Sequence, residues 1–263
     1  MASVTTLAQR EPLSTGDALR LEGVSRSFGA LKAVEDFSFS VAAGERRAVI
    51  GANGAGKTTL FNIITGDYAA SSGRVRFFGD DITNLPPHER IRAGLRRTYQ
   101  SSLLFRDLTV RDNLYLAVRG VSRGRFSLVR SGRSHVSRRA TDDVLERVRL
   151  SAVGDELVAS LSHGQQRQLE IGMALAGAPR LILFDEPAAG LSPAERRELV
   201  ALLAALPRHM SFILIEHDLE IALRVVDRVT VMHNGRMLKE GTPAEIENDP
   251  EVQEIYMGQA GHA

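Results

Sequence analysis

The segment Gly51-Ala52-Asn53-Gly54-Ala55-Gly56-Lys57-Thr58 combines residue types that could bind a chain of phosphates. Glycines let the backbone curl so that several N–H groups point at one anion. Lys57 supplies a positive charge for the terminal phosphates, and the hydroxyl of Thr58 is an oxygen ligand of the kind that Mg²⁺ prefers. A predicted helix that contains Thr59 follows, so a phosphate would also meet the positive end of a helix dipole.

The order Gly-x4-Gly-Lys-Thr, after a short strand from Arg47 to Ile50 and before a helix, is that of the phosphate-binding loop of ATP-hydrolysing proteins. A dinucleotide-binding loop is excluded because its order is Gly-x-Gly-x-x-Gly, whereas here the glycines are spaced Gly-x-x-Gly-x-Gly and a lysine follows. We therefore expect the chain to bind ATP through Gly51, Asn53, Gly54, Ala55, Gly56, Lys57, Thr58 and Thr59.

An acidic pair lies farther along the chain, directly after an apolar run. Leu181 to Phe184 predicts a buried strand, and Asp185 and Glu186 follow it. An aspartate at the carboxyl end of such a strand can hold Mg²⁺ through water, and the adjacent glutamate can orient or deprotonate an attacking water. Alone, such a pair is usually a helix N-terminal charge or part of a solvated loop. Beside a phosphate-binding loop, the catalytic interpretation is the better one.

His217 follows another apolar run, Phe212 to Ile215, within the tripeptide Glu216-His217-Asp218. A single histidine at a strand end is more often a structural hydrogen-bonding residue than a catalytic one. Neighbouring strands of a parallel sheet end at one edge, so we expect His217 to lie near the phosphate loop and to contact the terminal phosphate.

The chain around these residues must form a scaffold that brings them together. Helix Lys57 to Thr65 is predicted after the loop, and Gly66 is its stop signal. After about Gln165, helices and strands alternate, which predicts a parallel sheet covered by helices. The further predicted elements are strands Leu19 to Val24, Phe37 to Val41 and Val75 to Phe78, helices Thr141 to Leu150, Gln165 to Ala176 and Pro193 to Leu206, and a hairpin of Arg228 to Met232 with Arg236 to Lys239.

Composition restricts the class of protein. The 263 residues are 43% apolar and 25% charged, as in ordinary globular domains. The net charge of +1 gives no electrostatic argument for a nucleic-acid partner. Cysteine is absent, which excludes disulfides and thiol-ligated metals. No apolar run approaches the length of a membrane span, so we expect a soluble protein or one that sits on a membrane through a partner.

The run Leu161-Ser162-His163-Gly164-Gln165-Gln166 resembles the signature motif of the ATPase subunits of ABC transporters. The resemblance extends from Leu19 to about Gly258, with several motifs in the family's order and spacing. It implies an α/β fold: a P-loop NTPase core with a mixed, mainly parallel sheet, an antiparallel β subdomain and an inserted α-helical subdomain. The implied single domain covers 19–258, with its core at about 19–102 and 166–258 and its helical part at about 103–165; a disordered tail is expected at 1–18 and a short tail at 259–263.

The family pattern implies further roles and the ligands ATP and Mg²⁺. Phe28 resembles the aromatic residue that stacks on adenine, and Gln100 resembles the glutamine that touches Mg²⁺ or the attacking water. Ala189 to Pro193 resembles the loop, called the D-loop, that lies across the dimer interface. The implied catalytic residues are Glu186, His217 and Gln100, the metal ligands are Thr58, Gln100 and Asp185, and Ser162, Gly164 and Gln165 contact the terminal phosphate of ATP on an opposite subunit.

Two residues depart from the family pattern: His163 stands for a glycine in the signature and Ser192 for an aspartate in the D-loop. These departures and the C-terminal sequence resemble the ATPases of bacterial branched-chain amino acid importers. Urea and short-chain amide importers are closely similar. The implied partners are transmembrane permease subunits, a second ATPase subunit, identical or different, and a periplasmic substrate-binding protein. The implied location is peripheral, on the cytoplasmic face of the bacterial inner membrane.

Other functions stay open at this point. One is the minimal ATPase of a lipid or lipopolysaccharide exporter. A second is a non-transport ABC ATPase that acts on DNA or ribosomes, although such proteins usually carry tandem ATPase domains or long coiled coils. A third is a regulatory module that binds ATP without hydrolysis, against which Glu186 and His217 argue.

Two segments have no assigned role. Arg119 to Arg139 contains seven arginines and no acidic residue, which suits either anionic lipid head groups or a solvated insertion. Leu103-Leu104-Phe105 could belong to the groove that receives the membrane partner, or could be ordinary core.

Overall fold

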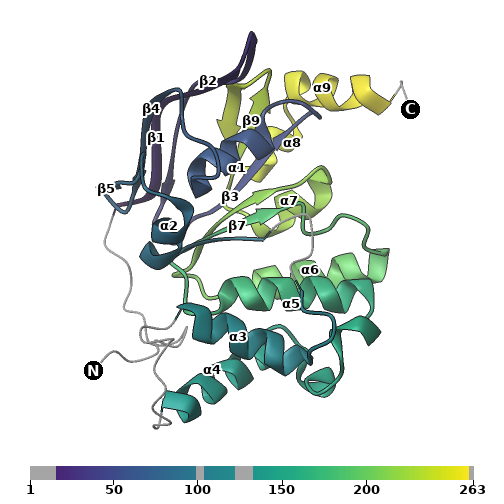
Figure 1. The fold of residues 1–263 in the computed structure, drawn as a ribbon. Helices are drawn as coiled ribbons and strands as arrows, with labels where there is room; N and C mark the ends of the chain where they lie inside the picture. The colour runs from purple at the N-terminus through teal and green to yellow at the C-terminus, as the bar shows by residue number, and fades with distance from the viewer. Residues whose placement is uncertain (1–15, 99–103, 122–132, 261–263) are drawn as a thin grey trace.

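The computed structural model describes residues 16–98, 104–121 and 133–260, so Gln100 and Leu103 lie outside the described residues (Figure 1). In chain order, its helices and strands are β1 Asp17–Phe28, β2 Leu31–Ala42, β3 Arg46–Gly51, α1 Lys57–Thr65, β4 Ser72–Phe77, β5 Asp80–Asp81, α2 Pro87–Ala93, β6 Leu95–Arg97, α3 Val110–Val121, α4 Arg133–Arg147, α5 His163–Leu175, β7 Leu181–Asp185, α6 Pro193–Ala204, β8 Ser211–Ile215, α7 Leu219–Val225, β9 Arg228–His233, β10 Arg236–Gly241, α8 Pro243–Glu247 and α9 Pro250–Ala260.

The larger sheet of the described residues has the strand order β10-β9-β3-β8-β7-β6. Its strands pair in parallel except for the β9–β10 hairpin. The central strands are buried on both faces, because alternate residues enter two different cores. Ile182 and Phe184 of β7 join the core with α5 and α6, whereas Leu181 and Leu183 pack in the core that holds α1. This double burial is the reason that these strands are apolar throughout.

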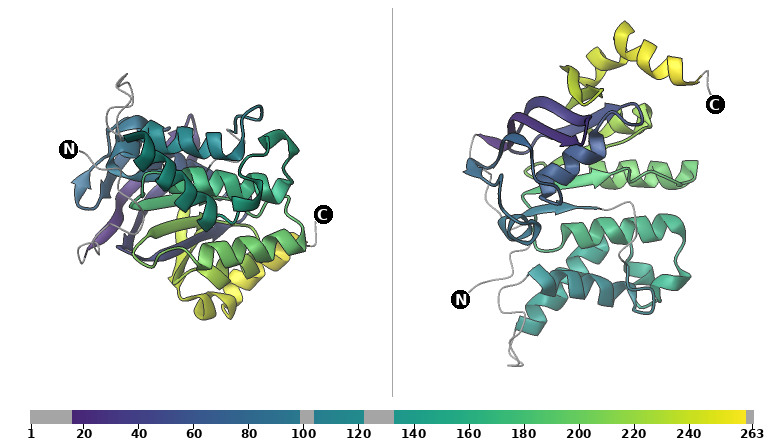
Figure 2. Two further views of the ribbon diagram at one scale, coloured as in Figure 1. Left: turned by 90° about the horizontal axis from the view of Figure 1, so that it is seen from below. Right: turned by 45° about the horizontal axis from the view of Figure 1, so that its top comes forward.

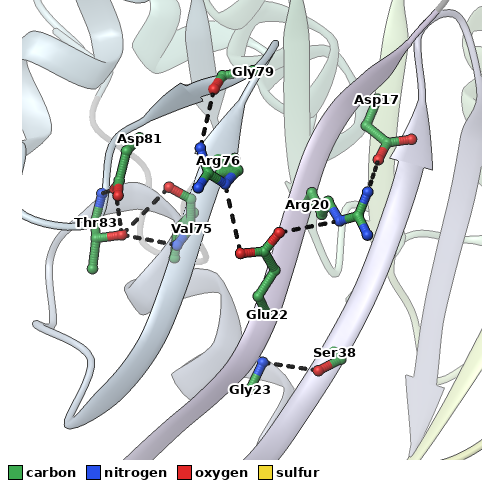
Figure 3. A network of polar contacts seen from close by, with 10 residues as sticks. All are labelled: Asp17, Arg20, Glu22, Gly23, Ser38, Val75, Arg76, Gly79, Asp81 and Thr83. Atoms are coloured by element: carbon green, nitrogen blue, oxygen red, sulfur yellow. Dashed lines mark hydrogen bonds and ion pairs between the residues drawn. The ribbon is translucent and has the colours of Figure 1, made fainter.

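The smaller sheet is antiparallel, with the order β2-β1-β4-β5 in the part of the chain that the structure describes. Its outer face carries a polar network in which Glu22 accepts from Arg20 and Arg76, at 3.3 and 3.5 Å (Figure 3). Exposed ion pairs of this kind contribute at most about 1 kcal/mol each. The inner face, with Leu19 and Leu21, is buried against the core of α1, and this burial holds the sheet in place.

Helices α3, α4 and α5 pack together on the side of the large sheet away from the small one (Figures 1 and 2). Helix α4 ends at Arg147, before the predicted end at Leu150, because Arg149 adopts a left-handed conformation with φ +60°. Within residues 16–98, 104–121 and 133–260, each helix is too short or too polar to span a bilayer.

The predicted helix Lys57 to Thr65 has the bounds of α1, and Gly66 with φ +85° is its C-cap. Helix α5 begins earlier than the predicted Gln165, at His163, because Ser162 caps it and Gln165 completes a capping box. Strand β1 continues past the predicted Val24 to Phe28 through register shifts that follow Leu21.

Candidate functional site

The loop between β3 and α1 is held from two sides by backbone. A Cβ on Gly56 would lie 2.3 Å from the carbonyl oxygen of Ala33 in β2. Gly56 also has φ +100°, which side-chain-bearing residues rarely adopt. On the other side, the Gly235 N–H of the β9–β10 hairpin donates to the Ala55 carbonyl at 3.0 Å. The geometry therefore requires glycine at position 56, and backbone contacts on two sides position the loop.

Lys57 points back into this loop. Its ammonium, in a side chain that is 5% exposed, donates to the carbonyls of Gly51 and Ala52 at 2.7 and 2.9 Å. Burial lowers the pKa of Lys57, and the carboxylates of Glu186 and Asp185 oppose that shift. A positive charge is thereby fixed at the centre of the loop.

The N-terminus of helix α1 is suited to bind an anion. Its first turn carries no acidic residue, and Gly56 supplies no side-chain cap. The backbone N–H groups of a first helical turn have no partner inside the helix, so a phosphate can accept from them. Thr58, the candidate metal ligand in that turn, is exposed, and Thr59 is half-buried.

Three strands end at the same edge as the loop. β8 lies between β3 and β7, and Ile215 of β8 is in register with Val49 of β3 and Asp185 of β7. The loop after Gly51, the Glu216-His217 pair and Glu186 therefore leave the sheet side by side. The electrostatic effect of Glu186 and Asp185 on Lys57 agrees with this arrangement.

Asp185 is 1% exposed and has two differently placed carboxylate oxygens. Oδ2 accepts from Nη2 of Arg97 at 2.6 Å. Oδ1 is buried without a hydrogen-bond partner among the described residues. An unpartnered carboxylate oxygen close to Lys57 is chemistry that suits Mg²⁺, which binds through one or two carboxylates and substrate phosphates. Of the predicted metal ligands, Asp185 and Thr58 are described, whereas Gln100 lies outside the described residues.

Glu186 and His217 form a close pair, with Oε1 of the glutamate 2.6 Å from Nε2 of the histidine. Glu186 has φ +48°, an uncommon conformation for a side-chain-bearing residue, and it is only 17% exposed. A backbone held in this way aims the carboxylate of Glu186 at the imidazole. Both groups follow strands that end at the same edge as the phosphate loop, and a carboxylate beside an imidazole is a pair that can accept a proton from water.

Glu216, for which the sequence predicts no role, joins two loops of this edge. Its side chain is buried, and Oε1 accepts from the Ala188 N–H at 2.8 Å. Burial raises the pKa of Glu216 to about 7, against the opposing effect of hydrogen bonds from the backbone of Ala188 and His217. Glu216 directly precedes His217, so its bond to the Ala188 N–H connects the loop after β8 with the loop that follows Glu186.

Glu216→Gln is expected to make the stability of the protein less dependent on pH. Because the folded-state pKa of about 7 exceeds the ordinary 4.5, the unfolded chain loses this proton first as pH rises, and wild-type stability falls between these values. The glutamine variant lacks that loss, so its advantage over wild type grows from near zero at pH 4.5 to about 3 kcal/mol above pH 7. Urea unfolding of the nucleotide-free protein at both ends of the range measures it. An exposed control, Glu198→Gln, should show no such growth, and a difference for Glu216→Gln that stays constant with pH would contradict the prediction.

The signature residues lie at the start of α5. Ser162 Oγ accepts from the Gln165 N–H, and Gln165 Oε1 accepts from the Ser162 N–H, which caps the helix. The Gly164 N–H donates to Glu195 at the start of α6. In the described part of the chain, the hydrogen bonds of Ser162, Gly164 and Gln165 stay between α5 and α6, and none reaches the phosphate loop.

Phe28 lies at the end of β1, 40% exposed, within an aromatic and cationic cluster. The rings of Phe28 and Tyr68 pack edge to face, with 5.4 Å between their centroids. The guanidinium carbon of Arg26 lies 4.7 Å from the centroid of the Phe28 ring. A partly exposed aromatic ring of this kind is able to stack on a base. Neither Tyr68 nor Arg26 was predicted as a site residue.

Comparison with known proteins adds two family matches. Residues 34–189 match the family model described as ABC transporter, and residues 240–262 match that of the branched-chain amino acid ATP-binding cassette transporter. The chain is 36% identical, over 92% of its length and 98% of the relative's, to the high-affinity branched-chain amino acid transport ATP-binding protein BraF of Pseudomonas aeruginosa. It is also 36% identical over the same shares to LivG of Escherichia coli, which carries the same description. A probable LivG of Archaeoglobus fulgidus is 37% identical over 91% of this chain and 95% of the relative.

Two solved structures resemble the fold. A structure described as the ADP conformation of an ATP-binding cassette of an ABC transporter is 34% identical and superposes with a TM-score of 0.81, covering 93% of this chain and 100% of the other. A nucleotide-free ATP-binding cassette from an ABC transporter is 35% identical with a TM-score of 0.77, covering 92% and 99%.

Proposed function

The chain belongs to the ABC transporter family, as an ATP-binding cassette with ATPase activity, and we propose that it powers the import of branched-chain amino acids. The observation that carries this substrate class is the match of residues 240–262 to the family model for branched-chain amino acid cassettes. Relatives described as branched-chain amino acid transport proteins over nearly their full length support it. They do not support the exporter, the non-transport ATPase or the regulatory module.

The candidate site residues take the following roles in this proposal. The loop N–H groups and Lys57 bind the phosphates of ATP, and Phe28 stacks on the adenine. Thr58 and the free oxygen of Asp185, with Gln100, would hold Mg²⁺, which would neutralise charge on the phosphates when bound. Glu186 accepts a proton from the attacking water, and His217 holds Glu186 in place and contacts the terminal phosphate.

A second ATPase subunit completes the site. Ser162, Gly164 and Gln165 present a helix N-terminus that makes no hydrogen bond to the loop of its own chain in the described residues. The proposal places this N-terminus on the terminal phosphate of ATP held by the partner, so ATP joins two subunits, identical or different.

The membrane partners are two kinds of protein: permease subunits, and a periplasmic substrate-binding protein that delivers the amino acid. The chain itself sits on the cytoplasmic face of the inner membrane. Phe105, 54% exposed beside the half-buried Leu104, is the candidate contact with the permease.

Deletion of the coding sequence in the source bacterium tests the substrate class. Uptake of radiolabelled leucine, urea and acetamide is measured in the deletion strain and after complementation with wild type or Glu186→Gln. The expected result is a loss of leucine uptake that wild type restores and the variant does not. Loss of urea or acetamide uptake instead would reassign the substrate, and unchanged uptake of all three with altered envelope lipids would favour an exporter.

A further inference from the structure

The carboxylate of Glu195, in the first turn of α6, connects two helices. Oε2 accepts from the backbone N–H and the hydroxyl of Ser192, at 2.9 and 2.8 Å. Oε1 accepts from the Gly164 N–H at 2.9 Å. One oxygen therefore serves the cap of its own helix, and the other reaches into the signature at the start of α5.

The contact with α5 goes beyond what helix capping requires. Thr242-Pro243-Ala244-Glu245 at the start of α8 is a capping box with nearly the same sequence as Ser192-Pro193-Ala194-Glu195. There the carboxylate of Glu245 accepts from the Thr242 N–H at 2.7 Å, and the box is complete without a donor from a second helix among the described residues. The bond between Glu195 and Gly164 is thus an addition to the cap.

Gly164 is shaped to admit this carboxylate. A Cβ at position 164 would lie 2.5 Å from Oε1 of Glu195 and 2.7 Å from its Cγ, so any side chain would displace the glutamate. Gly164 is buried, whereas its neighbours Ser162 and His163 are exposed. In the single chain, the Gly164 N–H is therefore already occupied by an internal anion.

A second contact joins the same two regions. Nε2 of His163 lies 3.4 Å from the carbonyl oxygen of Ala189, and a Cβ on Gly190 would lie 3.2 Å from that nitrogen. His163 directly precedes Gly164 in the chain, and Ser192 donates to Glu195, so each residue that departs from the family pattern is next to one partner of the bond between Glu195 and Gly164. The loop from Ala189 to Ser192 lies between Glu186 and α6 in the chain, and the Ala189 N–H donates to the carbonyl of Glu186, so this loop connects α6 with the edge that carries Glu186.

We propose that Glu195 is a positioning residue that holds the Gly164 N–H in the unpaired subunit and must release it when the phosphate of the partner's ATP arrives. This rests on the proposed function, in which that phosphate meets the signature. An N–H group carries one hydrogen, so the carboxylate and the phosphate compete for it. The two groups are both negative, so the incoming phosphate also repels Glu195. Glu195 therefore sets the ATP concentration at which two subunits pair, and its release moves the start of α6.

The test uses the full chain with Glu186→Gln, so that ATP is not consumed, and follows dimer formation by sedimentation as ATP is added. Glu195→Gln keeps an amide oxygen for the cap and removes the competing charge. It is expected to lower the ATP concentration for half-maximal pairing by about threefold to tenfold. Glu245→Gln, the matched change in the other capping box, is expected to leave that concentration unchanged.

A second measurement detects the hydrogen bond between Glu195 and Gly164 in the unpaired subunit, independently of dimer formation. In the nucleotide-free protein, Glu195→Ala is expected to speed hydrogen exchange at the Gly164 amide, and Glu245→Ala is not. Unchanged exchange, or unchanged or weaker pairing with Glu195→Gln, would overturn the inference while the proposed function stands. If the Glu186→Gln parent fails to pair at any ATP concentration, the paired site of the proposed function is wrong, and the inference fails with it.

Discussion

Glu186→Gln is expected to lower ATP hydrolysis by about a hundredfold or more and to leave ATP binding intact. Glutamine keeps the size of the side chain and an oxygen that His217 can reach, but it cannot accept the proton of the attacking water. The loop from Gly51 to Thr58, which holds the phosphates, is untouched by the change. ATP should therefore stay bound, and ATP-joined dimers should accumulate.

Phosphate release at saturating ATP measures the first effect, and sedimentation with ATP measures the second. Glu220→Gln is a suitable control, because Glu220 lies on the exposed surface of α7 and pairs with Arg224. It should hydrolyse ATP at the wild-type rate. Undiminished hydrolysis by Glu186→Gln would show that another group accepts the proton.

Arg97→Met is expected to destabilise the nucleotide-free protein by about 3 to 5 kcal/mol. The guanidinium of Arg97 is 5% exposed, and it neutralises the buried carboxylate of Asp185 at 2.6 Å. It also bonds Oδ1 of Asn62 at 2.5 Å and lies 3.6 Å from the carboxylate of Asp67. Removing the guanidinium leaves the carboxylate of Asp185 without this cation, and the carboxylate is too deeply buried to be solvated by water instead.

A double-mutant cycle isolates this pair from the other contacts of Arg97. Asp185→Asn removes the charge, so adding it to Arg97→Met should recover a substantial part of the lost stability in urea unfolding. Arg111→Met is the surface comparison: Arg111, 41% exposed, pairs with Asp142 and Asp155, and its loss should cost about 1 kcal/mol or less. Strictly additive effects of Arg97→Met and Asp185→Asn would contradict the role of the pair.

The ends of the helices could be predicted where a local sequence signal marks them, and could not where none does. Helix α1 was predicted with its true bounds, because glycines end it on both sides and a glycine cap is local. The end of α4 was predicted too late, because the left-handed conformation of Arg149 is not signalled by its residue type. The early start of α5 was readable, since Ser162 and Gln165 have the spacing of a capping box.

The site residues that the sequence did not predict are likewise of two kinds: one with a local sequence signal and two without. Glu195 had a local signal, the Ser192-x-x-Glu195 capping box, but its partner Gly164 lies on another helix. Arg97 and Glu216 had no signal. Arg97 is the last residue of β6 and Glu216 directly follows β8, and only the fold buries each side chain against a partner distant in sequence.

The sequence by itself determined the chemistry of this protein: a loop that curls around phosphate, a helix end behind it, and carboxylates and a histidine at the ends of buried strands. These follow from residue types over short spacings, where backbone freedom and hydrogen bonding act locally. The tertiary structure decided which charges neutralise one another. Arg97 pairs with Asp185, His217 pairs with Glu186, and Glu195 accepts from the Gly164 N–H because β6, β7, β8, α5 and α6 are brought together by burial of apolar side chains. Burial of apolar surface is non-directional, so the spacing of residues along the sequence does not show which charged side chains the fold will pair.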